Sequence, residues 1–322
     1  MNKKTIGALL VLGLVAFLGY RVFFMKEVSV NAQTKPIQNT CSVNGDCPFK
    51  NLTDDANLMT TGEFEHSHGL AVDAASSTRL YIATHNGLDV LVNDSKLYRV
   101  GKNTDDQMGF VASSKDSNVL FASGHSVTGG NIGVQKSEDG GVMWKKISDG
   151  VNGPVDFHAM TISLVDPNLL YGWYDGMLQR SNDGGVTWKL AAAKNLSQVI
   201  SLTSDSQTAN RLYATTASGI MLSSDDGETW SAWSEQFRND LVIVLVFNPK
   251  NATDALISTK QQGFLKTTDG GKTWKSMNLP EAKGLALFVT YDPQNPLNIY
   301  ALLTDQSLYK STNGGDVWKK IR

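Results

Sequence analysis

The sequence is poor in basic clusters and in long apolar runs. Its 29 basic and 31 acidic residues give a net charge of −2, and no block of Lys or Arg occurs. Nucleic acid is therefore not an expected partner. Beyond the N-terminal segment, the apolar run at 240–247 (DLVIVLVF) has only eight residues. Such a run is too short to cross a membrane and is typical of a buried inner strand.

Cysteine is also scarce, and the only two, Cys41 and Cys47, lie close together in NTCSVNGDCPFK. Outside the cytoplasm, an even number of cysteines at close spacing indicates a small disulfide loop. A metal site is the alternative, but two thiolates alone rarely complete one. We therefore expect a disulfide between Cys41 and Cys47.

The N-terminus has a pattern typical of export. Lys3 and Lys4 precede an apolar run over residues 5–20, which is followed by Arg21 and VFFM. A positive segment before an apolar one is typical of a signal peptide or an uncleaved anchor. The lysines favour the orientation in which the N-terminus stays inside the cell. We expect residues 1–25 to be this signal or anchor helix. The rest of the protein is then exported, either secreted or held on the outer face of the membrane by this segment only.

An internal repeat runs through most of the remaining chain. Five segments align: KSEDGGVMWKK, RSNDGGVTWKL, LSSDDGETWSA, KTTDGGKTWKS and KSTNGGDVWKK. Their shared acidic or amide positions and their tryptophans are Asp139, Asp183, Asp225, Asp269 and Asn313, and Trp144, Trp188, Trp230, Trp274 and Trp318. Successive tryptophans are 44, 42, 44 and 44 residues apart. This period is the length of a four-stranded propeller blade.

The repeat resembles the Asp-box, or BNR, repeat (Ser-x-Asp-x-Gly-x-Thr-Trp) of sialidases, sortilin-like receptors and photosystem assembly factors. Asp-Gly or Asn-Gly supplies a tight turn with positive φ. The Asp side chain accepts hydrogen bonds from turn amides, and the Trp packs between adjacent blades. The boxes depart from the pattern at Met143, Asp226, Asn313 and Val317. Because these boxes are structural turns, they predict the fold and say little about function.

Six apolar strands with a shared pattern predict six blades. They are RLYIATH, VLFASGH, LLYGWYD, RLYATTA, ALISTKQ and NIYALLT. The first blade has a degraded box in which Tyr98 replaces the tryptophan. We expect an all-β, six-bladed propeller over residues 64–322. Residues 26–63 are polar, contain both cysteines and are expected to form a linker or stalk.

All five histidines are in register with the first three blades. The central aromatic residue of the second strand is Tyr81, Phe121 and Tyr171 in these blades. Nine residues lie at three fixed distances from these aromatics: His66, Asp106 and Asp156; His68, Met108 and His158; and His85, His125 and Asp175. Blades 4 to 6 do not continue the pattern and carry, for example, Ala217 and Thr304.

These positions predict one site at the mouth of the channel. The start of an inner strand and the end of its antiparallel neighbour share one face of the propeller, opposite the boxes. Imidazole suits zinc, copper, iron or nickel, and the Met108 thioether favours copper. We expect a copper or zinc site with His68, His85, His125 and His158 as ligands. His66 and Met108 are the next candidate ligands. Asp106, Asp156 and Asp175 are expected either to bind the metal or to orient the histidines.

Nine candidates exceed one coordination sphere, so either some orient ligands or two ions bind. Lining a wet channel is the alternative role for all nine residues, with no metal present.

Two other functions fit the same positions. The phrases HSHGLAVD, THNGL, MGF, SGH and DFHA are similar to an exported bacterial Asp-box subfamily labelled glycosyl-hydrolase-like. That label comes from the repeat and is not evidence of glycosidase chemistry. A glycoside hydrolase stays an alternative because Asp106, Asp156 and Asp175 could supply the carboxyl pair that a glycosidase needs. A metal-assisted hydrolase that uses a metal-bound water is the other hydrolase alternative. Sialidase activity is not expected, because no arginine begins an inner strand as the sialidase arginine triad requires.

The third function is a sortilin-like or assembly-factor-like binding module without catalysis. Trp173 and Tyr174, beside Asp175, would then contact a small ligand, a sugar or a protein at the channel mouth. The sequence leaves these three functions open.

Overall fold

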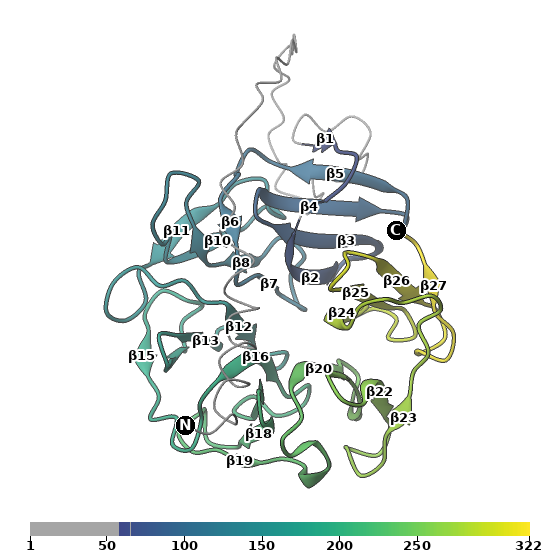
Figure 1. Cartoon of the computed structure of the whole chain (residues 1–322). Helices are drawn as coiled ribbons and strands as arrows, with labels where there is room; N and C mark the ends of the chain where they lie inside the picture. The colour runs from purple at the N-terminus through teal and green to yellow at the C-terminus, as the bar shows by residue number, and fades with distance from the viewer. Residues whose placement is uncertain (1–57, 65) are drawn as a thin grey trace, which may run out of the picture. The chain divides into compact units, whose positions relative to one another are not determined.

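The computed structural model of the protein describes residues 58–64 and 66–322. These residues form six antiparallel blade sheets that follow one another in chain order around a common centre (Figure 1). The only helix described is a short 3-10 helix, η2 (Glu235–Phe237). The predicted all-β, six-bladed propeller is confirmed. The predicted N-terminal helix and the cysteine pair lie outside the described residues.

Blades 3 to 6 are four-stranded meanders whose first strand lies innermost, and in blades 1 and 2 the innermost strands are β2 (Ser67–Asp73) and β7 (Val111–Ala112) (Figure 1). The strands of blades 1 and 2 are β1 (Leu58–Thr60), β2 (Ser67–Asp73), β3 (Ser76–Thr84), β4 (Gly87–Val92), β5 (Lys96–Val100), β6 (Asp106–Gln107), β7 (Val111–Ala112), β8 (Leu120–Ala122), β9 (Gly124–His125), β10 (Val134–Ser137) and β11 (Lys145–Ser148). Those of blades 3 and 4 are β12 (Ala159–Ile162), β13 (Leu170–Tyr174), β14 (Met177–Ser181), β15 (Lys189–Leu190), β16 (Val199–Ser204), β17 (Leu212–Thr216), β18 (Gly219–Ser223) and β19 (Ser231–Ala232). Those of blades 5 and 6 are β20 (Val242–Asn248), β21 (Asn251–Thr259), β22 (Gly263–Thr267), β23 (Lys275–Ser276), β24 (Ala286–Tyr291), β25 (Ile299–Leu303), β26 (Leu308–Ser311) and β27 (Lys319–Lys320).

Blades 1 and 2 depart from the regular four-stranded pattern. Strand β1 pairs with β5 and adds a fifth, outer strand to blade 1. It falls within residues 26–63, which the sequence predicts to be a linker. In blade 2 the inner hairpin is interrupted, so that β6 pairs with β9 and β7 pairs with β8.

All five predicted boxes form the same turn. In each, a Ser or Thr hydroxyl donates to the Asp or Asn side-chain oxygen at 2.7 to 2.9 Å. That oxygen also accepts the backbone N–H four residues later at 2.9 to 3.0 Å. The turn amides are thereby satisfied locally, as short polar side chains do in Asx-type turns.

The box tryptophans pack between blades, as predicted. Each contacts an apolar cluster that combines residues of its own blade with residues of the preceding one. Trp230, for example, is 3 % exposed and packs with Tyr171 and Leu178 of blade 3 and Leu212 of blade 4. The clusters therefore join neighbouring blades into one ring.

The ring closes between blades 6 and 1 by side-chain packing. Tyr300 and Leu302 of β25 belong to one buried cluster with Leu80 and Ile82 of β3. The Tyr300 hydroxyl also donates to Asp94 Oδ1 at 2.9 Å. Contacts of this kind replace a shared closing strand.

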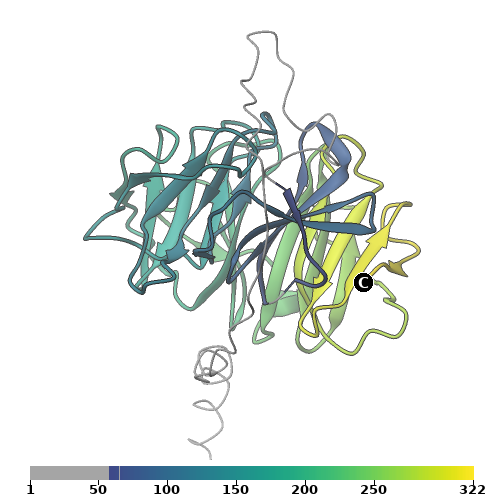
Figure 2. The same ribbon diagram turned by 90° about the horizontal axis from the view of Figure 1, so that it is seen from above.

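Seen at right angles to the first view, the strands run between two faces of the propeller (Figure 2). In blade 2, Ser137 of the box pairs with Leu120 at the start of β8, whereas His125 ends β9. The boxes and the histidines therefore lie on opposite faces, as predicted.

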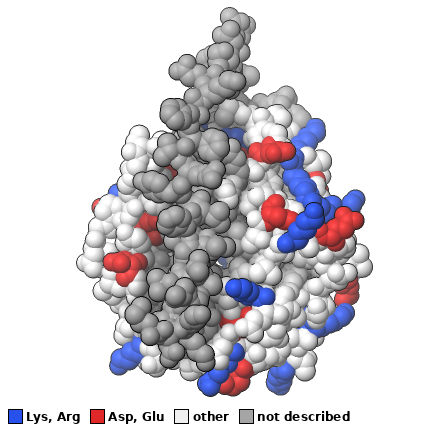
Figure 3. Space-filling view, viewed as in Figure 1, with Lys and Arg blue, Asp and Glu red and all other residues white. Residues whose placement is uncertain are grey.

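On the face shown in Figure 3, basic and acidic side chains of the described residues are interspersed. Within the described part of the chain, no helix is long and apolar enough to cross a membrane.

Candidate metal site

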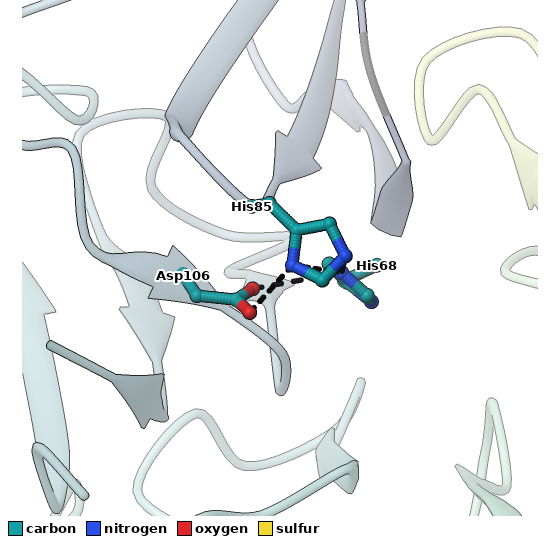
Figure 4. Close-up of side chains that lie close together, drawn as sticks. All are labelled: His68, His85 and Asp106. Carbon is teal, nitrogen blue, oxygen red and sulfur yellow. Dashed lines mark hydrogen bonds and ion pairs between the residues drawn. The ribbon is translucent and has the colours of Figure 1, made fainter. Parts of the chain in front are cut away.

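The first group of candidate ligands joins blades 1 and 2. His68 lies on β2, His85 follows β3 directly, and Asp106 lies on β6. Asp106 Oδ2 is 2.6 Å from His85 Nδ1, which is 3.1 Å from His68 Nε2 (Figure 4). One potential ligand atom from each of the three side chains lies within 4.8 Å of the other two. This spacing is compact enough to surround one metal ion.

The second group joins blades 2 and 3. His125 ends β9, and Asp156 and His158 lie immediately before β12. Asp156 Oδ2 is 3.0 Å from His125 Nε2 and 2.8 Å from His158 Nε2. This group also offers three ligand atoms within 4.8 Å of one another.

The imidazole of His125 lies between the two groups. Its Nε2 faces Asp156, while its Nδ1 is 4.0 Å from Asp106 Oδ2. The pairing of β6 with β9 places Asp106 directly opposite His125. The six side chains therefore form one continuous row across three blades.

Both carboxylates in this row carry an oxygen without a hydrogen bond. Oδ1 of Asp106 and Oδ1 of Asp156 are buried, and neither accepts a hydrogen bond from the described residues. The Asp156 side chain is only 7 % exposed, and Asp106 Oδ1 has His68 Nε2 at 3.5 Å. A buried carboxylate oxygen without a partner is costly, and a bound cation would remove that cost.

The surroundings shift the pKa values of two histidines in opposite directions. Burial lowers the pKa of His68 to about 4, aided by the neighbouring His85, His158 and His66 and opposed by Asp106. The hydrogen bond to Asp156 raises the pKa of His158 above its usual value. At neutral pH His68 is therefore a neutral imidazole, the form that binds a metal.

Three predicted site residues lie outside both groups. His66 is exposed, and its ring centroid is 5.6 Å from that of His85. Asp175 is an exposed turn residue with φ of 49° between β13 and β14. Met108 directly follows β6 and is partly buried, and its thioether as a copper ligand stays a prediction.

The aromatic pair beside Asp175 has structural contacts. Trp173 packs against the cluster that joins blades 3 and 4, and Tyr174 against the one that joins blades 2 and 3. The Tyr174 hydroxyl also accepts a hydrogen bond from Asn131 Nδ2 at 2.9 Å. Both side chains therefore pack between blades, and their contact with a ligand stays a prediction.

Gly124 supports the site and was not among the predicted residues. Its φ is +149°, and a Cβ atom there would lie 1.9 Å from the Asp106 carbonyl oxygen. Only glycine allows β6 and β9 to approach in this way and place Asp106 opposite His125. The glycine within SGH was the available signal, because a glycine inside a strand indicates close backbone approach.

Comparisons with known proteins agree with this architecture. Residues 218–322 match the family model described as sortilin, neurotensin receptor 3 (Sortilin-Vps10). The GH74 xyloglucanase from Xanthomonas campestris is similar in structure, with a TM-score of 0.57 and 17% identity over 82% of this chain and 46% of its own. The chain is an Asp-box (BNR) propeller that resembles glycosyl hydrolases.

Two further structures are similar to the chain in fold. A GH74 enzyme from Niastella koreensis has a TM-score of 0.54 and 15% identity, over 79% of this chain and 46% of its own. YCF48 bound to D1 peptide has a TM-score of 0.51 and 13% identity, over 83% of this chain and 86% of its own.

These likenesses show the fold alone. The chain spans less than half the length of these two GH74 enzymes. No curated protein sequence matches it.

Proposed function

We propose that this propeller binds a transition metal, zinc or copper, on the face of blades 1 to 3. Four imidazoles and two carboxylates from three blades gather in two compact groups. Nitrogen ligands of this kind suit zinc and copper, whereas calcium and magnesium take oxygen ligands. The observation that carries the proposal is that each group combines two imidazoles with a buried carboxylate Oδ1 atom that has no hydrogen bond from the described residues.

Lining a wet channel would not account for these two atoms equally well. The hydrogen bonds among the six side chains involve Oδ2 of both Asp106 and Asp156. They leave each Oδ1 without a hydrogen bond, although both atoms are buried from solvent. A metal ion would supply the missing positive partner, and burial already keeps His68 in the neutral form that binds a metal.

Metal-assisted hydrolysis is the second candidate function. The side chains of His85, His125 and His158 are 44, 42 and 60 % exposed, so the site is open to solvent. Catalytic metal sites keep a position for water, and a bound ion lowers the pKa of that water. Hydrolysis of glycoside or ester substrates by the metal-loaded protein, abolished by chelation, would support this function. Activity that survives chelation would contradict a metal-dependent reaction.

We also propose that the propeller is exported. The support is the positive and then apolar pattern of residues 1–25. Fractionation of cells that produce the full chain tests this, because a purely cytoplasmic protein would contradict it.

Elemental analysis of the full-length protein tests the metal proposal. The wild type and the double variant His68→Ala with His158→Ala are loaded with zinc or copper and dialysed together. The double variant loses one ligand from each group, so only the wild type should retain metal.

Asp316→Asn is the control for the metal content, because Asp316 is an exposed residue of the blade 6 box on the opposite face. It should retain as much metal as the wild type. Equal metal content in the wild type and the double variant would remove the proposal.

A further inference from the structure

We infer that the site holds two metal ions, one in each group, and that Asp106 couples them. This inference rests on the proposed metal binding and specifies its stoichiometry. The first group consists of His68, His85 and Asp106, and the second of His125, Asp156 and His158.

The spacing within each group suits one ion. Donor atoms that bind zinc at about 2.0–2.1 Å lie at most about 4 Å apart across the ion. Inside each group the potential ligand atoms lie within 4.8 Å, so small side-chain rotations bring all three onto one ion. Three protein ligands and one open position make a complete site for an accessible ion.

Six side chains are more than one tetrahedral ion can use. The surplus could consist of residues that orient ligands, but each group contains both an imidazole pair and a carboxylate of its own. Each group also contains its own buried oxygen without a hydrogen bond, Asp106 Oδ1 in the first and Asp156 Oδ1 in the second. Each group therefore has its own carboxylate oxygen available to an ion beside its own pair of imidazoles, which favours one ion in each group.

The geometry of His125 connects the two positions. Its Nε2 lies 3.0 Å from Asp156 Oδ2 and belongs to the second group. Its Nδ1 lies 4.0 Å from Asp106 Oδ2, within a small rotation of a hydrogen bond. A histidine that binds metal through one nitrogen commonly donates its other N–H to a carboxylate. Asp106 therefore serves the first ion as a ligand and the second by orienting His125.

The stoichiometry of Zn²⁺ binding tests this inference. Metal-free full-length protein is equilibrated with increasing Zn²⁺ by dialysis, and bound zinc is measured per chain. The wild type should bind two ions.

Variants restricted to one group should bind one ion. His68→Ala with His85→Ala removes the imidazoles of the first group and leaves the second intact. Asp156→Asn with His158→Ala does the converse. Asp106→Asn should weaken binding at both positions, because Asp106 contributes to both.

The possible outcomes separate this inference from the proposed function. One ion in the wild type and none in either double variant would overturn the two-ion inference and leave metal binding in place. No ion in the wild type would overturn both. Two ions in either double variant would place the ligands elsewhere and overturn the inference. The wild-type stoichiometry needs no variant, so a variant that fails to fold does not remove the test.

Discussion

Blades 1 and 4 build the same turn at the end of their second strand and use it differently. Thr84 Oγ1 donates to the Gly87 carbonyl at 2.9 Å, and Thr216 Oγ1 donates to the Gly219 carbonyl at 2.9 Å. The residue after the threonine is His85 in blade 1 and Ala217 in blade 4. The backbone therefore forms the turn with either residue. The histidine of blade 1 adds a potential metal ligand without changing the turn.

The two halves also differ in the partners of the polar side chains near this face. In blade 4, Ser201 Oγ and Thr215 Oγ1 bond to each other at 2.8 Å. In blade 6, Thr304 Oγ1 accepts the Leu285 N–H at 3.2 Å. On the same face of blades 2 and 3, Asp106 and Asp156 each keep an oxygen without a hydrogen bond. Buried oxygens without a hydrogen bond also occur in the other half, for example Asp240 Oδ2 before blade 5, but Asp106 and Asp156 are the ones that combine such an oxygen with a group of histidines among the described residues.

The largest effect is expected on stability, from a substitution in the packing between blades. Trp230→Ala removes an indole that is 3 % exposed and whose Nε1 donates to the Gly227 carbonyl at 3.0 Å. Loss of a buried aromatic side chain should reduce the free energy of unfolding by about 3–5 kcal/mol. Chemical denaturation of the full-length protein measures this value. A loss below about 1 kcal/mol, the size of an ordinary surface or minor core change, would contradict the role of the box tryptophan.

The next effect is confined to blades 1 to 3. Asp156→Asn should weaken zinc binding by at least about 10–100-fold, because even residues that only orient a ligand contribute that much. Competition with a chromophoric chelator measures the affinity. Asp316→Asn on the opposite face removes the same charge and should leave affinity unchanged. Equal weakening by both substitutions would mean that only overall charge matters.

A smaller effect is expected on the stability of the folded state at acid pH. The Thr229 hydroxyl, which donates to Asp225 Oδ2 at 2.6 Å, lowers the pKa of Asp225 to about 2. The depressed value stabilises the folded state above the unfolded pKa of about 3.9, and this contribution is lost as pH falls towards 2.

Thr229→Val should therefore move the pKa of Asp225 upward, and carbon-13 NMR titration of the carboxyl group measures the shift. Asp183 is the internal control, because its own pKa of about 2 depends first on Thr187. An unchanged titration of Asp225 would mean that the hydroxyl is not the cause.

The smallest effect is expected from Ala217→His. This exposed position is the blade 4 counterpart of His85, but its blade lacks the partners that surround His85. Bound zinc per chain should not change, and stability should change by no more than about 0.5 kcal/mol. An additional tightly bound ion would show that one histidine on this face suffices.

The fold could be predicted from the sequence because the box spacing equals the blade length. Once the register was known, strand polarity placed the nine candidate positions near one face, and six of them form the two groups. The pairing of individual side chains could not be predicted, because it depends on the interrupted hairpin of blade 2 and on Gly124. Asp175 has the same offset as His85, yet it has a left-handed φ of 49° and joins neither group. Backbone conformation at a single turn residue is not visible in a repeat register.

Anomalous diffraction from crystals of the zinc-loaded protein tests the central claim most directly. Peaks at the zinc absorption edge are expected about 2.0–2.1 Å from nitrogen atoms of His68 and His85, and of His125 and His158. Peaks only on the box face, or no peak near these histidines at saturating zinc, would contradict metal binding by these residues.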